Sequence, residues 1–231
     1  MDYILISDLD DTLVGDKNSL EEFNNLIISR RENFFLVYSS GRFKNSILSL
    51  IEKENLIQPD AIICNVGTEI YYPPSWERDK DWENIMSECW DKNKIIKKLE
   101  NFHIQLQPYD KEFTASYYVE DESTVNKIID ALKEFKVKII FTKNYLLDII
   151  PAPGGKGQAA KFLHSKIGVP TICCGDSEND IDMLTKCDFG ILVGNADTNV
   201  KKELKGYQDI YQSKMNYAKG VIEGLNFYKA I

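Results

Sequence analysis

The chain of 231 residues is poor in the patterns that several classes of protein require. None of its apolar runs approaches the ~18 residues of a membrane-spanning helix, and no basic stretch precedes an apolar one at its beginning, as in a secretory signal. It has only two histidines, and its five cysteines show neither a CxxC motif nor Cys/His metal spacing. It also lacks internal repeats and low-complexity segments. We therefore expect a cytoplasmic protein with reduced, buried thiols and no membrane partner.

The charge balance is acidic, with 36 Asp and Glu against 28 Lys and Arg, which gives a net charge of −8. A nucleic acid or an anionic membrane is not an expected partner for such a chain. An acidic protein that binds an anionic substrate has to gather its positive charge locally. The length suits one large or two small domains of roughly 100–200 residues each, and 43% hydrophobic residues suffice for a buried core.

Short apolar runs alternate with amphipathic segments in both terminal parts of the chain. The amphipathic segments cover residues 19–30, 43–53 and about 178–186, with apolar residues at helical spacing. The alternation predicts an α/β fold with a parallel sheet that is covered on both faces. The predicted strands are YILIS (3–7), FFLVY (34–38), DAIIC (60–64), PTICC (170–174) and FGILV (189–193).

The middle of the chain has a different pattern. Helical periodicity covers residues 91–101 and 123–135, and strand candidates cover 113–120, 137–141 and 145–150. This order predicts an antiparallel sheet with helices on one face, inserted into the first domain because the parallel pattern resumes after Lys156. Pro/Gly-rich stretches at 73–74 and 151–155 punctuate the two predicted crossings. We predict a discontinuous core of residues 1–76 and 154–231 and an inserted α+β unit of residues 77–153.

The first apolar run ends in acids, in the stretch ILISDLDDTL. Ligands of open α/β sheets bind beyond the carboxyl ends of the strands, where Asp8 and Asp10 would lie. Side chains two residues apart in extended backbone point the same way. Two such carboxylates can hold a hard cation such as Mg²⁺, or one of them can act as a nucleophile. The simpler alternative is a solvated turn capped by Asp11 and Thr12.

A later apolar run has the same feature, because GDSEND follows PTICC. Asp176 would lie at the same edge of the sheet as the first acids. Asn179 and Asp180 would open the next helix, where backbone N–H groups favour anions. A capping turn is the simpler explanation of this stretch alone. Two acidic strand ends in one parallel sheet favour a site.

Two further elements could hold a phosphate group. Ser40 and Gly41, in VYSSGRF, can offer a hydroxyl and a closely approaching amide, although such a sequence is also common in plain turns. Lys156, in GGKGQA, would open a helix, where the helix dipole opposes a cation. A bound phosphate would explain that position, and an exposed lysine in a glycine turn is the alternative.

Taken in order, DLDDT, SGR, the lysine of GGKGQA and GDSEND resemble the four motifs of the haloacid dehalogenase superfamily of phosphohydrolases. The resemblance implies a doubly wound, mostly parallel Rossmann-like core, and the insertion is similar to the α+β cap of the branch that acts on sugar phosphates. The stretches RRENFFLVYSSGR, PDAIICNVGTEIYY and YQSKMNYAKGVIEGLNFY are similar to those of the bacterial sucrose-6-phosphate phosphatases. NVGTE at 65–69 replaces the Asn-Gly-Ala/Gly of many other relatives, which favours this group.

The resemblance implies a role for each motif residue. Asp8 would attack phosphorus and become an aspartyl phosphate, and Asp10 would protonate the leaving sugar oxygen and then activate water. Mg²⁺ would be held by Asp8, by the backbone carbonyl of Asp10 and by Asp176. Asp180 would orient Lys156 or a metal-bound water. The phosphoryl oxygens would be surrounded by Ser40, Gly41, Lys156 and Asn179.

The insertion and the core loops that face it would bind the sugar. The three tryptophans are assigned to hydrophobic packing, and no step needs either histidine. The predicted partner is a small-molecule sugar phosphate, and the resemblance suggests the sucrose-phosphate-forming enzyme as a protein partner. We expect a monomer. The candidate sugar contacts are Arg42, Thr68, Glu69, Ser116 and Tyr118.

Several alternatives stay open at this point. The same chemistry would suit mannosylfructose phosphate, mannosyl phosphoglycerate or glucosylglycerol phosphate in place of sucrose 6-phosphate. A phosphomutase would hold a phosphorylated sugar for a second transfer. A phospho-accepting receiver module also gathers acids, a hydroxyl and a lysine at one sheet edge, but it is about half this length and lacks the large insertion.

Overall fold

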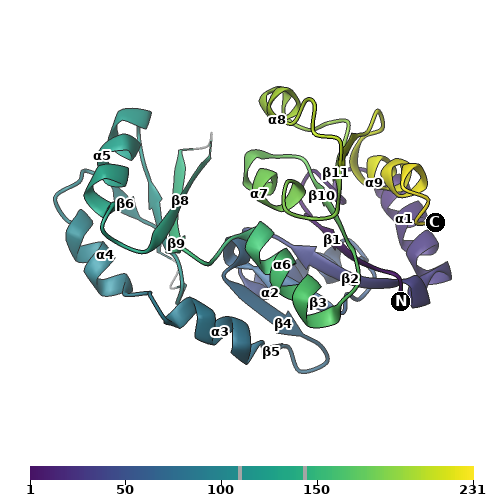
Figure 1. The fold of residues 1–231 in the computed structure, drawn as a ribbon, viewed down its shortest axis with the longest axis horizontal. Helices are drawn as coiled ribbons and strands as arrows, with labels where there is room; N and C mark the ends of the chain where they lie inside the picture. Colours follow the sequence, from purple (N-terminus) through teal and green to yellow (C-terminus); the bar gives the residue numbers. More distant parts are fainter. Residues whose placement is uncertain (109–110, 143–144) are drawn as a thin grey trace.

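The structure is a computed structural model that describes residues 1–108, 111–142 and 145–231. Its larger sheet has eight strands in the order β12-β11-β10-β1-β2-β3-β4-β5 (Figure 1). The strands from β12 to β3 pair in parallel, and β4 and β5 add an antiparallel edge. The strands are β1 (Tyr3–Ser7), β2 (Phe34–Ser39), β3 (Ala61–Cys64), β4 (Glu69–Tyr72), β5 (Glu77–Arg78), β10 (Thr171–Gly175), β11 (Phe189–Leu192) and β12 (Ile210–Gln212).

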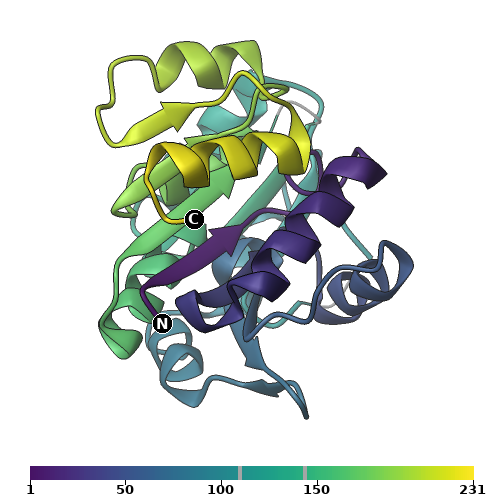
Figure 2. The same ribbon diagram turned by 90° about the vertical axis from the view of Figure 1, so that its right-hand side faces the viewer.

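Helices cover both faces of this sheet, as predicted. The helices α1 (Lys17–Ser29), α2 (Lys44–Lys53) and α9 (Tyr217–Phe227) share one hydrophobic cluster with the strands, and α1 lies beside α9 (Figure 2). On the other face, a second cluster contains residues of three further helices. These are α3 (Lys80–Ser87), α6 (Lys156–Ile167) and α7 (Ile181–Leu184), and the remaining short elements of this unit are α8 (Thr198–Glu203), η1 (Arg31–Asn33), η2 (Asn65–Gly67) and η3 (Glu178–Asp180).

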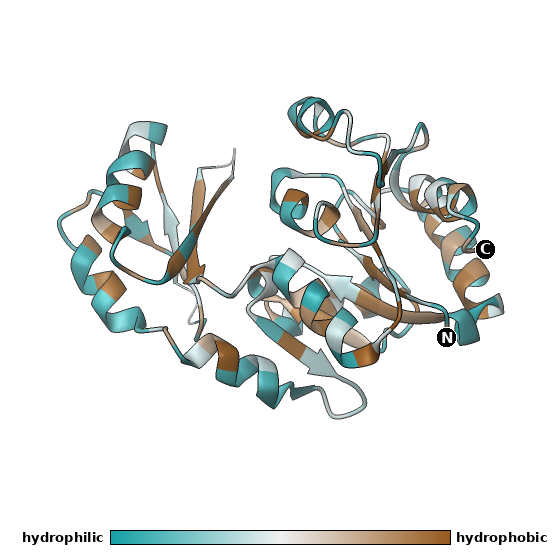
Figure 3. Ribbon diagram, in the orientation of Figure 1, coloured by the Kyte–Doolittle hydropathy of each residue, from teal (hydrophilic) through white to brown (hydrophobic). Residues whose placement is uncertain are grey.

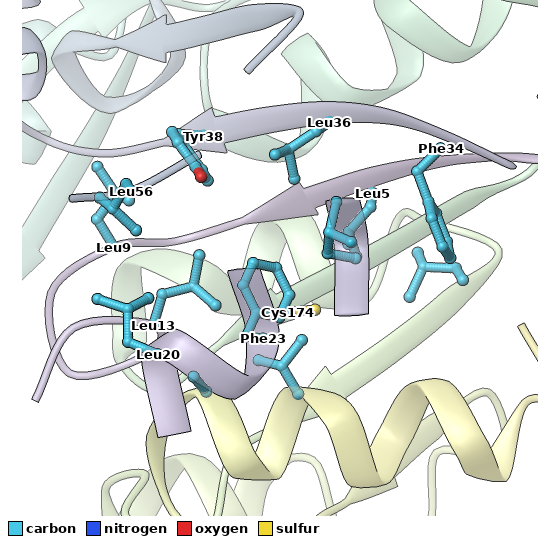
Figure 4. Close-up of a cluster of buried hydrophobic side chains, with 14 of the residues drawn as sticks. Leu5, Leu9, Leu13, Leu20, Phe23, Phe34, Leu36, Tyr38, Leu56 and Cys174 are labelled. Carbon is cyan, nitrogen blue, oxygen red and sulfur yellow. The ribbon is translucent and has the colours of Figure 1, made fainter. Parts of the chain in front are cut away.

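The central strands are apolar on both sides because both sides are covered. Leu5 of β1 belongs to the cluster under α1, whereas its neighbours Ile4 and Ile6 belong to the cluster under α6. The chain beyond β1 stays in the core, since Leu9 and Leu13 are fully buried beside the first cluster (Figure 4). Burial of these leucines anchors the turn between them, which carries Asp10 and Asp11, and Asp8 lies directly before it.

The smaller sheet is antiparallel and has the order β6-β7-β9-β8, with both of its helices on one face (Figures 1 and 3). Ala115 and Tyr117 of its second strand point into the cluster under the helices, and Ser116 between them points to the opposite face. This arrangement confirms the predicted α+β insertion. Its elements are β6 (Gln105–Leu106), β7 (Ala115–Tyr118), β8 (Val137–Thr142), β9 (Leu146–Pro151), α4 (Lys92–Leu99) and α5 (Glu122–Leu132).

The residues just beyond the predicted division at residue 77 pair and pack with the larger sheet. Strand β5 hydrogen-bonds to β4, and Trp82 and Met86 of α3 are buried in the cluster under α6. Pro73 and Pro74 therefore lie in the hairpin between β4 and β5, not at a crossing between the two sheets. Strand pairing and side-chain packing therefore assign residues 77–87 to the unit of the larger sheet, whereas the predicted division places them in the insertion.

Two further expectations concern cysteines and membranes. All five cysteines are free thiols, and Cys64, Cys173 and Cys174 are buried. Burial raises the pKa of each of these three thiols well above its ordinary value, so they remain protonated. Among the residues that the structure describes, no helix is both long and apolar enough to cross a membrane.

Candidate active site

The predicted motifs meet at the carboxyl edge of the larger sheet, because its parallel strands all end there. Asp8 follows β1, and its backbone N–H donates to the carbonyl of Cys174 in the neighbouring β10, 3.0 Å away. The chain then turns sharply, with the amides of Leu13 and Val14 donating to the carbonyl of Leu9 at 3.0 and 2.8 Å. This turn keeps the leucines in the core and leaves the acids at the edge of the sheet.

Lys156 stands at the centre of the site and is 1% exposed. Its Nζ donates to Asp8 Oδ1 at 2.6 Å, to Asp180 Oδ1 at 2.7 Å and to Asn179 Oδ1 at 3.3 Å. Burial alone would lower the pKa of this lysine, but the carboxylates of Asp180 and Asp8 raise it above its ordinary value. The ammonium therefore stays charged, and the predicted contact between Asp180 and Lys156 is present.

A capping box holds the GDSEND loop in place. The second oxygen of Asp180, Oδ2, accepts the backbone N–H groups of Asp176 and Ser177 at 3.1 and 3.2 Å and the Ser177 hydroxyl at 3.2 Å. Thr12 Oγ1 donates to Asp176 Oδ1 at 3.0 Å, which links the first motif to the last. The roles of Ser177 and Thr12 were not predicted from the sequence. The Ser-x-x-Asp spacing of 177–180 is a signal from which the first could have been predicted.

Three carboxylates crowd around this lysine. Oxygen atoms of Asp8, Asp176 and Asp180 all lie within 4.8 Å of one another. Burial raises the pKa of Asp8 well above its ordinary value. Burial, and then the charge of Asp180, raise the pKa of Asp176 to about 7. When all three carboxyls are ionised, they leave two negative charges against the one ammonium, and the oxygen-only donor set suits a hard divalent cation such as Mg²⁺.

Asp10 takes a different position from the other acids. Its carboxylate faces Arg42, whose Nε and Nη2 donate to its two oxygens at 2.7 Å each. The three-carboxylate cluster thus contains Asp180, whereas the predicted ligand set names Asp10, through its backbone carbonyl, beside Asp8 and Asp176. Arg42, a predicted sugar contact, is instead engaged in this ion pair.

The predicted phosphate-binding turn lies next to this pair. Ser40 is 2% exposed, and its Oγ accepts the backbone N–H of Arg42 at 3.2 Å across Gly41. The η2 loop packs against the lysine from the other side. Gly67 has φ of +90°, and a Cβ there would lie 2.4 Å from the backbone nitrogen of Lys156. Only a glycine permits this approach, so the NVGTE loop and the lysine motif form one unit.

A cavity of about 620 Å³ lies beside the η2 loop, where residues of both units meet. Asn65 donates through Nδ2 to Glu69 Oε2 at 2.8 Å, while its buried Oδ1 has no hydrogen-bond partner among the described residues. Arg78 donates to Glu69 at 3.3 Å and, across the two units, to Glu112 at 2.6 Å. The lining contains Asn65, Glu69, Tyr71, Arg78, Lys44, Lys92, Lys111 and Glu112.

The remaining predicted sugar contacts are dispersed. Thr68 is 1% exposed and donates its hydroxyl to the carbonyl of Asn65 at 3.0 Å. Ser116 donates to Asp148 and lines a cavity of about 440 Å³ that adjoins the larger one through Lys92. Tyr118 is exposed and lines neither cavity. Glu69 is thus the predicted sugar residue that lines the larger cavity.

Comparison with known proteins identifies similar chains. A family model described as sucrose-6F-phosphate phosphohydrolase matches residues 1–229. A probable sucrose-phosphatase 2 of Arabidopsis thaliana is 31% identical over 98% of this chain, which spans 59% of that relative's length. A mannosylfructose-phosphate phosphatase of Agrobacterium fabrum is 27% identical over 97% of this chain and 96% of its own length.

Solved structures agree with the fold. The sucrose-phosphatase of Synechocystis, solved with sucrose and phosphate, superposes with a TM-score of 0.92 at 28% identity over 99% of this chain and 98% of its own. A haloacid dehalogenase-like hydrolase from Bacillus subtilis superposes with a TM-score of 0.75 at 22% identity, over 99% of this chain and 92% of its own. The predicted fold class, a mostly parallel α/β core with an inserted α+β cap, is therefore confirmed.

Proposed function

Because this chain belongs to the sucrose-6F-phosphate phosphohydrolase family of the haloacid dehalogenase superfamily, we propose that it hydrolyses a sugar phosphate, with sucrose 6-phosphate preferred. The observation that carries the proposal is the buried Lys156 ammonium shared by Asp8 and Asp180 inside a cluster of three carboxylates. The excess negative charge of such a site attracts a divalent cation, and a bound cation together with the Lys156 ammonium would then favour a phosphate group.

A residue is assigned to each step of the reaction. Asp8 attacks phosphorus, the bond from phosphorus to the sugar oxygen breaks, and Asp10 gives that oxygen its proton. Asp10 then takes a proton from the water that attacks the aspartyl phosphate, which releases phosphate and regenerates Asp8. Lys156 and Asn179, with the Ser40 hydroxyl and the Gly41 amide, stabilise the phosphoryl oxygens.

The acid cluster fits Mg²⁺, which Asp8 and Asp176, with the backbone carbonyl of Asp10, would hold. The ion supplies charge neutralisation between the carboxylate nucleophile and the anionic substrate. Asp180 is assigned to Lys156, whose ammonium it holds at 2.7 Å. The Lys156 ammonium in turn offsets part of the free-energy cost of burying an ionised Asp8.

The sugar is assigned to the cavity of about 620 Å³ beside the η2 loop. The backbone N–H of Asn65, a residue of the cavity wall, donates to the carbonyl of Arg42 at 2.9 Å, so this wall is joined directly to the residue that pairs with Asp10. Glu69 and the unpaired Asn65 Oδ1 offer acceptors for sugar hydroxyls. The Synechocystis structure, which contains sucrose and phosphate, supports sucrose 6-phosphate, and the Agrobacterium relative supports mannosylfructose phosphate as the second candidate.

We assign the chemistry to the predicted core, residues 1–76 and 154–231, with residues 77–87 added because β5 and α3 pair and pack there. The antiparallel unit would supply substrate specificity. The cytoplasm is the proposed compartment, consistent with five unpaired cysteines.

A substrate panel tests the proposal. Phosphate release is measured with Mg²⁺ or with EDTA for sucrose 6-phosphate, mannosylfructose phosphate, glucosylglycerol phosphate, mannosyl phosphoglycerate and glucose 6-phosphate. We expect Mg²⁺-dependent turnover that is fastest with sucrose 6-phosphate, abolished in Asp8→Asn and unchanged in a control variant at the exposed Asp130 of α5. Wild-type-like turnover by Asp8→Asn would refute the nucleophile, and a low rank of sucrose 6-phosphate would refute the substrate.

A further inference from the structure

Arg42 and Asp10 form an ion pair with two hydrogen bonds next to the predicted phosphate-binding turn. Both oxygens of the carboxylate are used, at 2.7 Å from Nε and 2.7 Å from Nη2, which is the planar two-bond geometry that only a guanidinium provides. The third nitrogen, Nη1, donates to Ser46 Oγ on α2 at 3.0 Å. Ser46 thus prevents the guanidinium from rotating away from the carboxylate.

The backbone of Arg42 is held as firmly as its side chain. Its N–H donates to Ser40 Oγ at 3.2 Å, and its carbonyl accepts the N–H of Asn65 at 2.9 Å. Arg42 therefore connects three features: the predicted phosphate-binding hydroxyl, the wall of the cavity and Asp10. The side chain is only 39% exposed, although it carries a full charge at a loop.

Asp10 depends on this arginine for its orientation. Its side chain is 47% exposed, and among the described residues no other side chain hydrogen-bonds to its carboxylate. By contrast, Asp8 and Asp180 are held by Lys156, and Asp176 is held by Thr12. Without Arg42, the Asp10 side chain would be free to adopt its other staggered rotamers.

We infer that Arg42 is a positioning residue, whose guanidinium fixes the orientation of the Asp10 carboxylate and acts on turnover through Asp10. The inference rests on the proposed function, in which Asp10 carries the proton to and from the reacting oxygens. It replaces the sequence-based assignment of Arg42 as a sugar contact, because three of its five N–H groups, one on each nitrogen, are already engaged by Asp10 and Ser46.

The expected loss of kcat can be estimated from the known effects of misplacing a general acid or base. A general acid or base contributes roughly 10²–10⁴-fold to a rate, and a displacement of about 1 Å can remove about 100-fold. Arg42→Gln should therefore lower kcat by about 10- to 100-fold while KM changes less than about threefold. Arg42→Lys, which can donate to only one carboxylate oxygen in this geometry, should lie between Arg42→Gln and the wild type.

A double-mutant cycle separates action through Asp10 from direct contact with the sugar. Single-turnover rates of phosphate release are measured for the wild type, Arg42→Gln, Asp10→Asn and the double variant, on whichever substrate of the panel the wild type hydrolyses fastest. We expect Arg42→Gln to cost 10-fold or more when Asp10 is present and less than about threefold when it is absent. If sucrose 6-phosphate is not the preferred substrate, the cycle can still be measured, so an error in the substrate assignment and an error in this inference give different results.

Two results would overturn the inference: an equal loss in both backgrounds, which would make Arg42 a direct substrate contact, or a higher kcat in Arg42→Gln. Thermal melts in each background confirm that the variants are folded. Arg31→Gln is the matched control, since it breaks another arginine–aspartate pair of the same sheet, to Asp60 at 2.6 Å, outside the site. Its kcat should equal that of the wild type.

Discussion

Asp176 provides a quantitative test of the acid cluster, because the free energy of unfolding that its buried charge costs the metal-free protein can be calculated. Burial and the neighbouring charge of Asp180 raise the pKa of this carboxyl from 3.8 to about 7. Between these two pH values the folded state binds more protons than the unfolded state, so the free energy of unfolding falls as pH rises. Each pH unit costs about 1.4 kcal/mol, which gives an upper bound of about 4 kcal/mol at pH 8.

Asp176→Asn removes the charge and keeps both the size of the side chain and an oxygen that can accept from Thr12. In EDTA at pH 8, we expect the variant to be more stable than the wild type by about 2–4 kcal/mol, and at pH 5 by no more than about 1.7 kcal/mol. Mg²⁺ should stabilise the wild type by RT ln(1 + [Mg²⁺]/Kd), about 2.7 kcal/mol at 100 times Kd, and should have little effect on the variant.

Urea unfolding followed by tryptophan fluorescence measures these differences at both pH values, with Mg²⁺ or with EDTA. Asp130→Asn, at the exposed surface of α5, is the control for the loss of one negative charge and should follow the wild type throughout. The reasoning fails if Asp176→Asn is no more stable than the wild type in EDTA at pH 8. It also fails if Mg²⁺ stabilises both proteins equally.

Two further predictions concern the contacts around the site. Gly67→Ala would place a Cβ 2.4 Å from the Lys156 backbone nitrogen, so we expect at least a 10-fold lower kcat and a lower melting temperature. The control is Gly168→Ala, which is also at positive φ but faces open space. It should cost only about 1–2 kcal/mol of stability and leave kcat intact. Equal kcat in the two variants would contradict the close packing of the η2 loop on the lysine. Lys138→Met breaks the 2.8 Å pair to Asp182 between β8 and α7, so amide exchange in residues 151–155 should accelerate while the free energy of unfolding changes by less than about 1 kcal/mol. Unchanged exchange in that segment would show that this pair does not restrain the two units.

The sequence alone determined the sheet, the insertion and the meeting of the motifs. Apolar runs of four to six residues are a local signal, and parallel strands have to end at one edge, so Asp8, Asp176 and Ser40 were predictable as neighbours. Lys156 was predictable because a cation at a helix N-terminus is unfavourable without an anionic partner. The structure shows two such partners, Asp8 and Asp180.

Only the tertiary structure decided how the side chains pair and where the edges of the units lie. The pairing of Arg42 with Asp10 joins two loops 32 positions apart, and spacing along a strand had suggested that Asp10 would face the same way as Asp8. Among the described residues, the Asn65 side-chain oxygen is left without a hydrogen-bond partner by the packing of η2 on its surroundings, which no local pattern records. Strand β5 is two residues long, and it belongs to the larger unit only because it pairs with β4. Helix α3 belongs there because its side chains pack in the cluster under α6. Local propensity selects the elements, but the direction of a polar side chain is set by the groups that long-range folding brings within about 3 Å.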